Sequence, residues 1–372
     1  MSAALPDLLK KPGAMVECDD DPEAVYELLC AKGWSDGLPV IPPTPERVER
    51  MLAYWDRDLD QTIVKIPPRY GAATPLRVAA NAVMAGCKPE HFPLVALALE
   101  ALAEEPYNLY GTQATTHPCT PMLIFNGPIA KAVGINSGHN AMGNYFRANA
   151  AIGRAVRLSL VNIGAAIPGT GDMATHGTPA KFTFCVAENE EASPWEPLHV
   201  EMGFPKESTT VTVVAAEGPH NINDHECLTP EGILTMCAGT MATVGSNNPY
   251  YAGQPVLAFG PEHAQTAAKG GMSKKDVKQW LYDRATVPLS AFSKEGIERR
   301  FRRKLAEQFA NAPLDTRVHM FAKPEDLVVI VTGGAGKHSM WVPTFGNTRA
   351  VIRPLKHANG EFVRKIEDLK RG

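Results

Sequence analysis

The feature that most constrains the fold is a strand–turn–helix pattern that occurs twice. Residues 121–128 read Pro-Met-Leu-Ile-Phe-Asn-Gly-Pro, and residues 255–261 read Pro-Val-Leu-Ala-Phe-Gly-Pro. An alanine-rich segment follows each of them and ends at a glycine, Gly134 or Gly270. Self-similarity of this kind indicates a repeated structural unit. The same pattern recurs in unrelated α/β proteins, so it does not establish a repeat on its own.

Two further echoes occur in the same order. Upstream, Thr-Pro leads to Ala-Gly over residues 74–86 and again over 229–239; downstream, residues 184–197 and 330–343 align without a gap and both end in Ser-x-Trp-x-Pro. We therefore predict an α/β fold with two similar repeats related by internal duplication, and an N-terminal helical arm. The predicted segments are the arm (1–60), repeat one (61–208), repeat two (209–350) and a C-terminal tail (351–372).

Short elements separated by glycine and proline fill both repeats. Thr-Pro pairs at 44–45, 74–75 and 229–230 predict helix starts with a hydroxyl N-cap, and residues 273–276 predict a capping box. One amphipathic helix is expected over 294–309, and another after residue 147 with Ile152, Val156, Leu160 and Ile163 on its buried face. Apolar or β-branched runs predict strands at 61–66, 121–125, 181–187, 210–215, 255–259 and 327–332.

Composition excludes several classes of protein. The 372 residues are 44% hydrophobic and 21% charged, as in folded globular chains. A net charge of −3 argues against nucleic acid as a partner. The longest apolar run, near residues 92–103, is too short to span a bilayer, so no membrane partner is expected.

Seven widely spaced cysteines, an odd number without a Cys-x-x-Cys pair, argue against a disulfide framework. The first residues show neither an apolar h-region nor a small-residue cleavage site. These observations predict a cytoplasmic protein. Homo-oligomerisation is expected through the arm, where Trp34, Leu38 and Val40 lie among prolines.

Equivalent strand ends of two repeats would face each other across a cleft, where ligand sites tend to occur. Repeat one ends in an acidic stretch with Glu190 at its centre, and repeat two ends in a glycine-rich loop that contains Gly334, Gly336, Lys337 and His338. Glycine amides and a lysine suit an anion, and a glutamate or histidine can transfer a proton. An ordinary solvated turn is the alternative for both loops. The glycine spacing does not fit a phosphate-binding Walker loop, so no nucleotide cofactor is expected.

A second polar segment, residues 111–121, has many hydrogen-bonding side chains and no apolar period, which predicts a loop at a pocket wall. Thr115 and Thr116 are candidate substrate ligands, and His117 with Cys119 is a candidate base–thiol pair. Cys87 is a second candidate thiol. Buried structural cysteine is the alternative for both.

Further candidates lie in the middle of the chain. Arg147 and Arg154 share one side of a helix and suit a carboxylate, with a structural ion pair as the alternative. His220 and Asn221 are expected in a strand-end loop at the cleft. Metal binding stays open, because no closed ligand motif occurs. A divalent ion could nevertheless bind Glu190 or Glu201 together with some of the histidines His176, His199, His220 and His225.

Three stretches resemble an uncharacterised bacterial family: WSDGLPVIPPT (34–44), AVMAGCKPE (82–90) and GGAGKHS (333–339). The resemblance covers most of the chain. That family is associated with small thiol or selenol proteins bearing a selenocysteine-or-Cys-Gly-Ser-Cys motif. The resemblance therefore implies a small thiol or selenol protein as a partner, and it implies no catalytic residues.

The sequence favours a small-molecule metabolic enzyme, a hydrolase or lyase acting on a small anionic or amide-like substrate. Lys337 and the glycine loop would hold the anion, and Glu190 or a histidine would move the proton. Two alternatives stay open. One is a thiol-dependent redox or transfer enzyme that uses Cys87 or Cys119, and the other is a non-catalytic binding protein.

Overall fold

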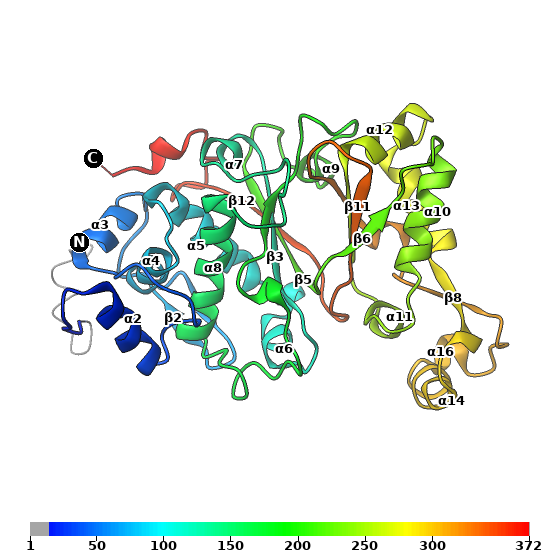
Figure 1. Cartoon of the computed structure of the whole chain (residues 1–372), viewed down its shortest axis with the longest axis horizontal. Coiled ribbons are helices and arrows are strands. Elements are labelled where there is room, and N and C mark those ends of the chain that lie inside the picture. Colours follow the sequence, from blue (N-terminus) through cyan, green and yellow to red (C-terminus); the bar gives the residue numbers. More distant parts are fainter. Residues whose placement is uncertain (1–14, 372) are drawn as a thin grey trace. The chain divides into compact units, whose positions relative to one another are not determined.

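The computed structural model describes residues 15–371. Its architecture is mixed α/β, which confirms that part of the predicted fold class (Figure 1). The chain divides into two compact units. Unit 1 comprises the described residues up to Ala187, His199–Val214 and the segment from Ala350 onward, and unit 2 comprises Glu188–Leu198 and Ala215–Arg349.

The sheet of unit 1 has the strand order β12-β5-β3-β4. β3 is parallel to β4, and β12 is antiparallel to β5. Every residue of β3 and β5 is buried, as expected for central strands covered on both faces. The strands are β3 (Thr120–Asn126), β4 (Cys185–Ala187), β5 (Thr210–Ala216) and β12 (Val351–Pro354), and a separate antiparallel pair is β1 (Val64–Ile66) with β2 (Gly71–Ala73).

Helices pack against this sheet: α5 contacts β12, α8 contacts β4, and α4 packs on both helices (Figure 1). Ile152, Val156, Leu160 and Ile163 are all buried, which confirms the predicted core face at the end of α8. The helices are α2 (Pro22–Ala31), α3 (Pro45–Leu52), α4 (Pro75–Met84), α5 (Phe92–Leu102), α6 (Leu109–Ala114), α7 (Pro128–Ala132), α8 (Arg147–Asn162) and α9 (Leu198–Glu201), with 3₁₀ turns at Pro89–His91, Glu105–Tyr107, Pro179–Lys181 and Ile366–Leu369.

The turn between β3 and α7 requires a glycine. Gly127 has a φ of 90°, and a Cβ atom there would lie 2.2 Å from the carbonyl oxygen of Ser208. A side chain would therefore both strain the backbone and push the segment before β5 away.

The sheet of unit 2 has the order β10-β7-β11-β6. β7 is parallel to β10, and β11 is antiparallel to both β7 and β6. α10 and α12 contact this sheet, and α13 packs on α10 (Figure 1). The elements are β6 (His220–Asn223), α10 (Pro230–Met241), α11 (Asn248–Tyr251), β7 (Val256–Phe259), α12 (Pro261–Lys269), α13 (Lys274–Arg284), β10 (Val328–Val331) and β11 (His338–Val342).

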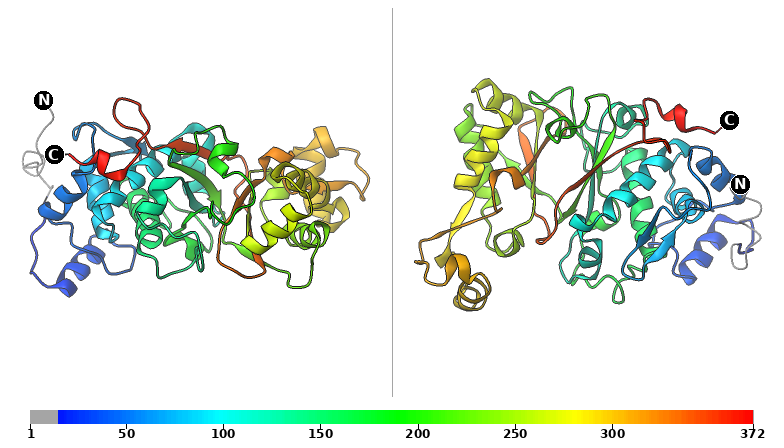
Figure 2. Two further views of the ribbon diagram at one scale, coloured as in Figure 1. Left: turned by 90° about the horizontal axis from the view of Figure 1, so that it is seen from above. Right: turned by 180° about the vertical axis from the view of Figure 1, so that it is seen from behind.

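The rest of unit 2 is a region of short elements between β8 and β9, which Figure 2 shows extending from the body of this unit. The predicted single helix over 294–309 is wrong, because a π-helical turn interrupts it. Its apolar face is nevertheless largely correct, with Ile297, Phe301 and Phe309 buried. The elements are β8 (Thr286–Pro288), a 3₁₀ turn (Leu289–Ala291), α14 (Lys294–Gly296), the π turn (Ile297–Phe301), α15 (Arg302–Lys304), α16 (Ala306–Phe309), β9 (Arg317–His319) and a 3₁₀ turn (Pro324–Asp326).

Three other expectations need correction. The segment 220–223 is the strand β6 rather than a loop, because it pairs with β11. The start of the polar segment 111–121 lies in α6 and its end lies in β3. The ungapped echo of 184–197 and 330–343 breaks down in its second half, since residues 339–342 belong to β11 whereas residues 193–197 are outside any helix or strand.

The N-terminal region contains the two helices α2 and α3, and α3 packs against α4 with Val48, Met51 and Leu52 buried. The expectation about the first 14 residues lies outside the described residues. Among residues 15–371, the helices are all too short or too polar to cross a lipid bilayer.

Candidate functional site

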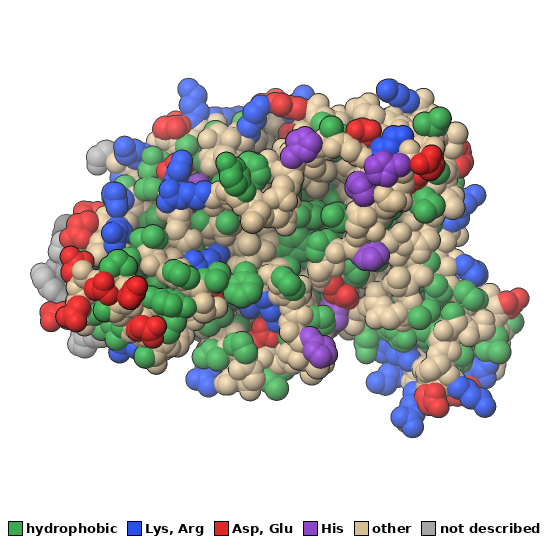
Figure 3. All heavy atoms as spheres, in the orientation of Figure 1, with side chains coloured by type: hydrophobic (Ala, Val, Ile, Leu, Met, Phe, Trp, Pro, Cys, Tyr) green, Lys and Arg blue, Asp and Glu red, His purple; other side chains and the backbone are tan. Residues whose placement is uncertain are grey.

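Three polar side chains meet on the exposed side of the β6–β11 pair in unit 2. The Nδ1 atom of His338 lies 3.0 Å from Oδ1 of Asn221, and its Nε2 atom lies 3.3 Å from Nε2 of His225. An amide oxygen only accepts hydrogen bonds, so Nδ1 of His338 carries the proton and Nε2 carries the lone pair. Figure 3 shows histidine side chains gathered on the visible face of unit 2 over β11 and β6.

The pairing of β6 with β11 explains why these side chains meet. Asn221 pairs with Met340, so His338 is its diagonal neighbour on the same face of the sheet. The intervening residues, Ile222 and Ser339, point to the buried face. His220 pairs with Trp341, which places it on the opposite face from Asn221.

Two side chains fix the backbone that carries His225. Nε2 of His263 donates to the carbonyl oxygen of Asp224 at 2.9 Å, and Nζ of Lys337 donates to the carbonyl oxygen of His225 at 2.8 Å. Burial lowers the pKa of His263, although its hydrogen bond to Asp224 opposes that effect. His263 therefore stays neutral and acts as a fixed donor in the interior.

The glycine-rich loop binds a carboxylate of the protein itself. The amide of Gly336 donates to Oε1 of Glu262 at 2.7 Å. The φ angles of Gly333 and Gly336 are 106° and 135°, which only glycine adopts readily. Gly334 lies between them and is partly exposed. Glu262 thus occupies one amide of the loop, and the predicted binding of a substrate anion there stays a prediction.

The acidic stretch after β4 lies against this loop, within unit 2. The amide of Asn189 donates to the carbonyl oxygen of Val331 at 2.7 Å, and its side-chain amide donates to that of Gly333 at 3.2 Å. Glu190, the next residue, is half-buried. Glu188 is buried and accepts a hydrogen bond from the amide of Leu198 at 2.8 Å. The structure therefore brings the two predicted loops together.

The carboxylate of Asp224 and the thiol of Cys227 flank His225 in the sequence. Burial acts to raise the pKa of Asp224, but hydrogen bonds from Cys227 and Glu226 outweigh it and hold the pKa below its ordinary value. The same hydrogen bond to Asp224 raises the pKa of the Cys227 thiol. Cys227 is therefore held as a thiol, which is a poor nucleophile.

Ser339 and His263 have the geometry of a hydroxyl–base pair. Nδ1 of His263 lies 2.8 Å from Oγ of Ser339, and Ser339 also accepts from the amide of Gly260 at 3.2 Å. The exposed fractions of Ser339 and His263 are only 3% and 1%, so a substrate cannot reach them. The pair links α12 to β11 and supports the exposed histidines.

The predicted site residues Thr115, Thr116 and Cys119 lie in unit 1. Oγ1 of Thr115 accepts the amide of His117 at 3.1 Å, and the carbonyl oxygen of the exposed Thr116 accepts from Thr175. Cys119 is buried, with its thiol 3.6 Å from the carbonyl oxygen of Thr112. Thr115 and the buried thiol thus make local structural contacts.

The two arginines of α8 have different partners. Nε of Arg147 donates to the carbonyl oxygen of Gly86 at 2.8 Å and is exposed. Arg154 forms a two-pronged ion pair with Asp36, with both distances 2.7 Å. Arg154 is therefore committed to the segment after α2, and Arg147 is the more accessible of the two.

A buried ionic network in unit 1 was not predicted. Arg157 lies 3.2 Å from Oε1 of Gln113 and 3.5 Å from Asp172, which also binds Lys181. Burial lowers the pKa of Arg157, while Asp172 opposes that shift. Because each charged group has a partner of opposite charge, we assign the network a structural role.

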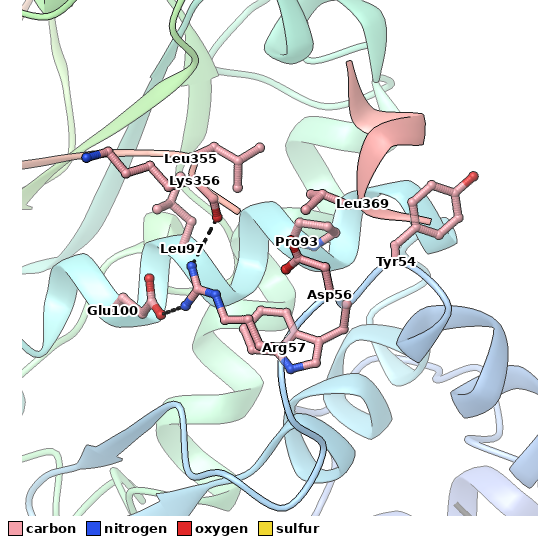
Figure 4. Close-up of a pocket in the computed structure, with 10 residues that line it drawn as sticks. Tyr54, Asp56, Arg57, Pro93, Leu97, Glu100, Leu355, Lys356 and Leu369 are labelled. Atoms are coloured by element: carbon pink, nitrogen blue, oxygen red, sulfur yellow. Dashed lines mark hydrogen bonds and ion pairs between the residues drawn. The ribbon is translucent and has the colours of Figure 1, made fainter. Parts of the chain in front are cut away.

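A shallow hollow in unit 1 is lined by none of the predicted site residues. Figure 4 shows Arg57 reaching across it to Glu100 and Lys356. Because the chain's own arginine bridges this hollow and ties the C-terminal segment to α5, we assign it a structural role.

Within residues 15–371, side chains of His, Cys, Asp and Glu nowhere form a group of three or more arranged to hold a metal ion. The sequence singled out His338 and Asn221 and named His225 only as a metal candidate. No local signal could have joined His225 to His338, since 113 residues separate them.

No protein-family model matches the chain, and no curated protein matches it.

Proposed function

We propose that this chain is a small-molecule metabolic enzyme, a hydrolase or lyase, whose proton transfers are carried by His338 and His225. The observation that supports this most is the placement of polar groups around His338, with the side-chain oxygen of Asn221 at Nδ1 and the ring of His225 at Nε2. A protonated His338 would donate from both nitrogens. The pair can thus take one proton from a substrate or from water and later return it.

The proposed substrate is a small anionic or amide-like molecule. Lys337 supplies a positive charge beside the pair, since its ammonium reaches the carbonyl oxygen of His225. The glycine loop supplies amides, and its hold on Glu262 supports carboxylate recognition. Glu190 is the proposed additional carboxylate, supported by the contact of its neighbour Asn189 with this loop.

Thiol chemistry at Cys87 or Cys119 is less favoured by the geometry. Both side chains are buried, and burial raises the pKa of the Cys87 thiol well above its ordinary value. A thiolate nucleophile needs the opposite environment.

We infer internal duplication as the origin of the two sheets, with a different boundary from the one the sequence predicts. Supporting it, β4-β3-β5 in unit 1 and β10-β7-β11 in unit 2 have the same order, each with a parallel first pair. The fourth strand is exchanged: β12 completes the first sheet and β6 completes the second. On this assignment β5 and β6 belong to repeat one.

The proposal also includes a cytoplasmic location and a homo-oligomer. All seven cysteines are free thiols, as expected in a reducing compartment. The segment after α2 exposes Trp34, Leu38 and Ile41, which supports a contact surface there. A small thiol or selenol protein remains a proposed partner from the sequence resemblance.

The test is a turnover screen by NMR of small carboxylates, amides and esters with the wild-type chain. We expect at least one compound to be consumed, and expect His338→Gln to lower its rate by about a hundredfold or more. Lys337→Ala and Glu190→Gln should also lower it, whereas His176→Gln on unit 1 is the matched control. Binding without conversion, or full activity in His338→Gln, would refute the proposal.

A further inference from the structure

The two histidines suggest a second property that requires no turnover. Their Nε2 atoms are 3.3 Å apart, the rings are 79° from parallel, and both residues are exposed. That distance is at the long end for a hydrogen bond. Two nitrogens bound at about 2.0–2.1 Å to one tetrahedral ion would also lie about 3.3 Å apart.

The surroundings fit metal ligation. Ligand histidines usually donate their other ring N–H to an oxygen, which fixes the ring and its tautomer. Asn221 provides that oxygen for His338 at 3.0 Å. For His225, the backbone is held by His263 and Lys337, so little reorganisation is needed.

Charge does not oppose a cation here. Lys337 brings one positive charge, and its ammonium is turned to the carbonyl oxygen of His225. Asp224, next to His225, and Glu262, bound at Gly336, bring negative charges on the adjoining loops. Imidazole nitrogens prefer zinc, copper and nickel to magnesium or calcium, which select oxygen ligands.

We propose that His225 and His338 form a two-histidine site for one divalent transition-metal ion, with water in the remaining positions. His225 would carry its proton on Nδ1 when the ion is bound, so that both Nε2 lone pairs face the metal. The inference uses the same side chains as the proposed reaction but does not rest on that reaction, because it concerns binding alone.

The test is calorimetric titration of the purified, metal-free full chain with Zn²⁺, together with the absorption spectrum of its Co²⁺ complex. We expect one ion per chain at this site, with His225→Ala and His338→Ala each losing that ion. Asn221→Ala should weaken binding by about tenfold, and Asn221→Asp should strengthen it, because a carboxylate raises the basicity of the ligand. His176→Ala is the control and should bind as the wild type does.

Circular dichroism of each variant separates loss of the site from loss of the fold, and the exposed positions of both histidines favour folded variants. The proposal is overturned if the wild type binds no Zn²⁺ saturably. It is also overturned if the folded double variant His225→Ala/His338→Ala keeps the same stoichiometry. Neither measurement uses turnover, so the metal-binding result does not depend on whether the activity screen finds a substrate.

Discussion

At the scale of single residues, His91 shows how burial makes a neutral side chain essential. It is 1% exposed; its Nδ1 accepts from the amide of Lys88 at 3.2 Å, and its Nε2 donates to the carbonyl oxygen of Val133 at 3.3 Å. These two bonds require the neutral ring with one proton on Nε2. Burial lowers the pKa of His91 to about 4.

This pKa predicts acid sensitivity. In the unfolded chain His91 takes up a proton near pH 6.5, but in the folded chain only near pH 4, so the unfolded state binds more protons between those values. Stability contributed by His91 is thus complete above pH 6.5 and declines by about 3 kcal/mol as the pH falls to 4. Urea unfolding at several pH values should show a steeper decline for the wild type than for His91→Gln, and parallel curves would contradict this.

The cysteines give a second prediction at this scale. Cys87, Cys119, Cys185 and Cys237 are buried, and burial raises the pKa of Cys237 to about 12. Iodoacetamide should therefore modify the exposed Cys18 and Cys30 of the native protein first, with the four buried thiols modified only in urea. Peptide mass spectrometry reads out each site. Equal rates at Cys119 and Cys30 in native protein would restore the thiol mechanism.

At the scale of elements, three helices begin at Thr-Pro pairs but differ in their caps. Oγ1 of Thr229 accepts the amide of Gly232 at 3.2 Å, and Thr74 caps α4 in the same way, whereas Thr44 makes no such bond. Thr229→Ala should cost about 1 kcal/mol in unfolding free energy. Thr44→Ala serves as the comparison and should cost less; equal losses would mean that the cap bond contributes nothing.

Local sequence patterns predicted the structural features that depend only on residues close together in the chain. The helix starts at Pro45, Pro75 and Pro230 were predictable because a proline after a threonine favours the first helical position, and the capping box of Ser273 was predictable because it uses residues three apart. The strand β6 was not, because its polar run His-Asn-Ile-Asn becomes a strand only by pairing with β11. The π turn at 297–301 was missed for a similar reason, since the apolar spacing alone suggested a regular helix.

In the candidate site too, the sequence predicted individual residues but not the contacts between them. The sequence predicted His338, Lys337 and Asn221 as site residues, because each lies in a polar or glycine-rich segment next to a predicted strand. Their meeting with His225, and the support from His263, depend on the register of a strand pair and on the buried contact of α12 with β11. No pattern within a short window encodes such long-range contacts.

At the scale of the whole molecule, the last segment of the chain belongs to unit 1. β12 pairs with β5, although it follows unit 2 in the sequence. A chain that ends at Arg349 should therefore lose amide protection in β5 while β6 and β11 keep theirs, as measured by hydrogen exchange. Loss of protection in β11 with β5 unchanged would contradict the pairing of β12 with β5.

The proposed proton transfer requires His338 to be held between Asn221 and His225 with its proton on Nδ1, and imidazole nitrogen NMR identifies that tautomer. In the metal-free protein near neutral pH, long-range ¹⁵N–¹H spectra should show His338 as the Nδ1–H tautomer, and Asn221→Ala should disturb its signals while leaving those of His176 unchanged. A His338 found as the Nε2–H tautomer, or signals of His338 that Asn221→Ala leaves unchanged, would contradict the proposed role of His338.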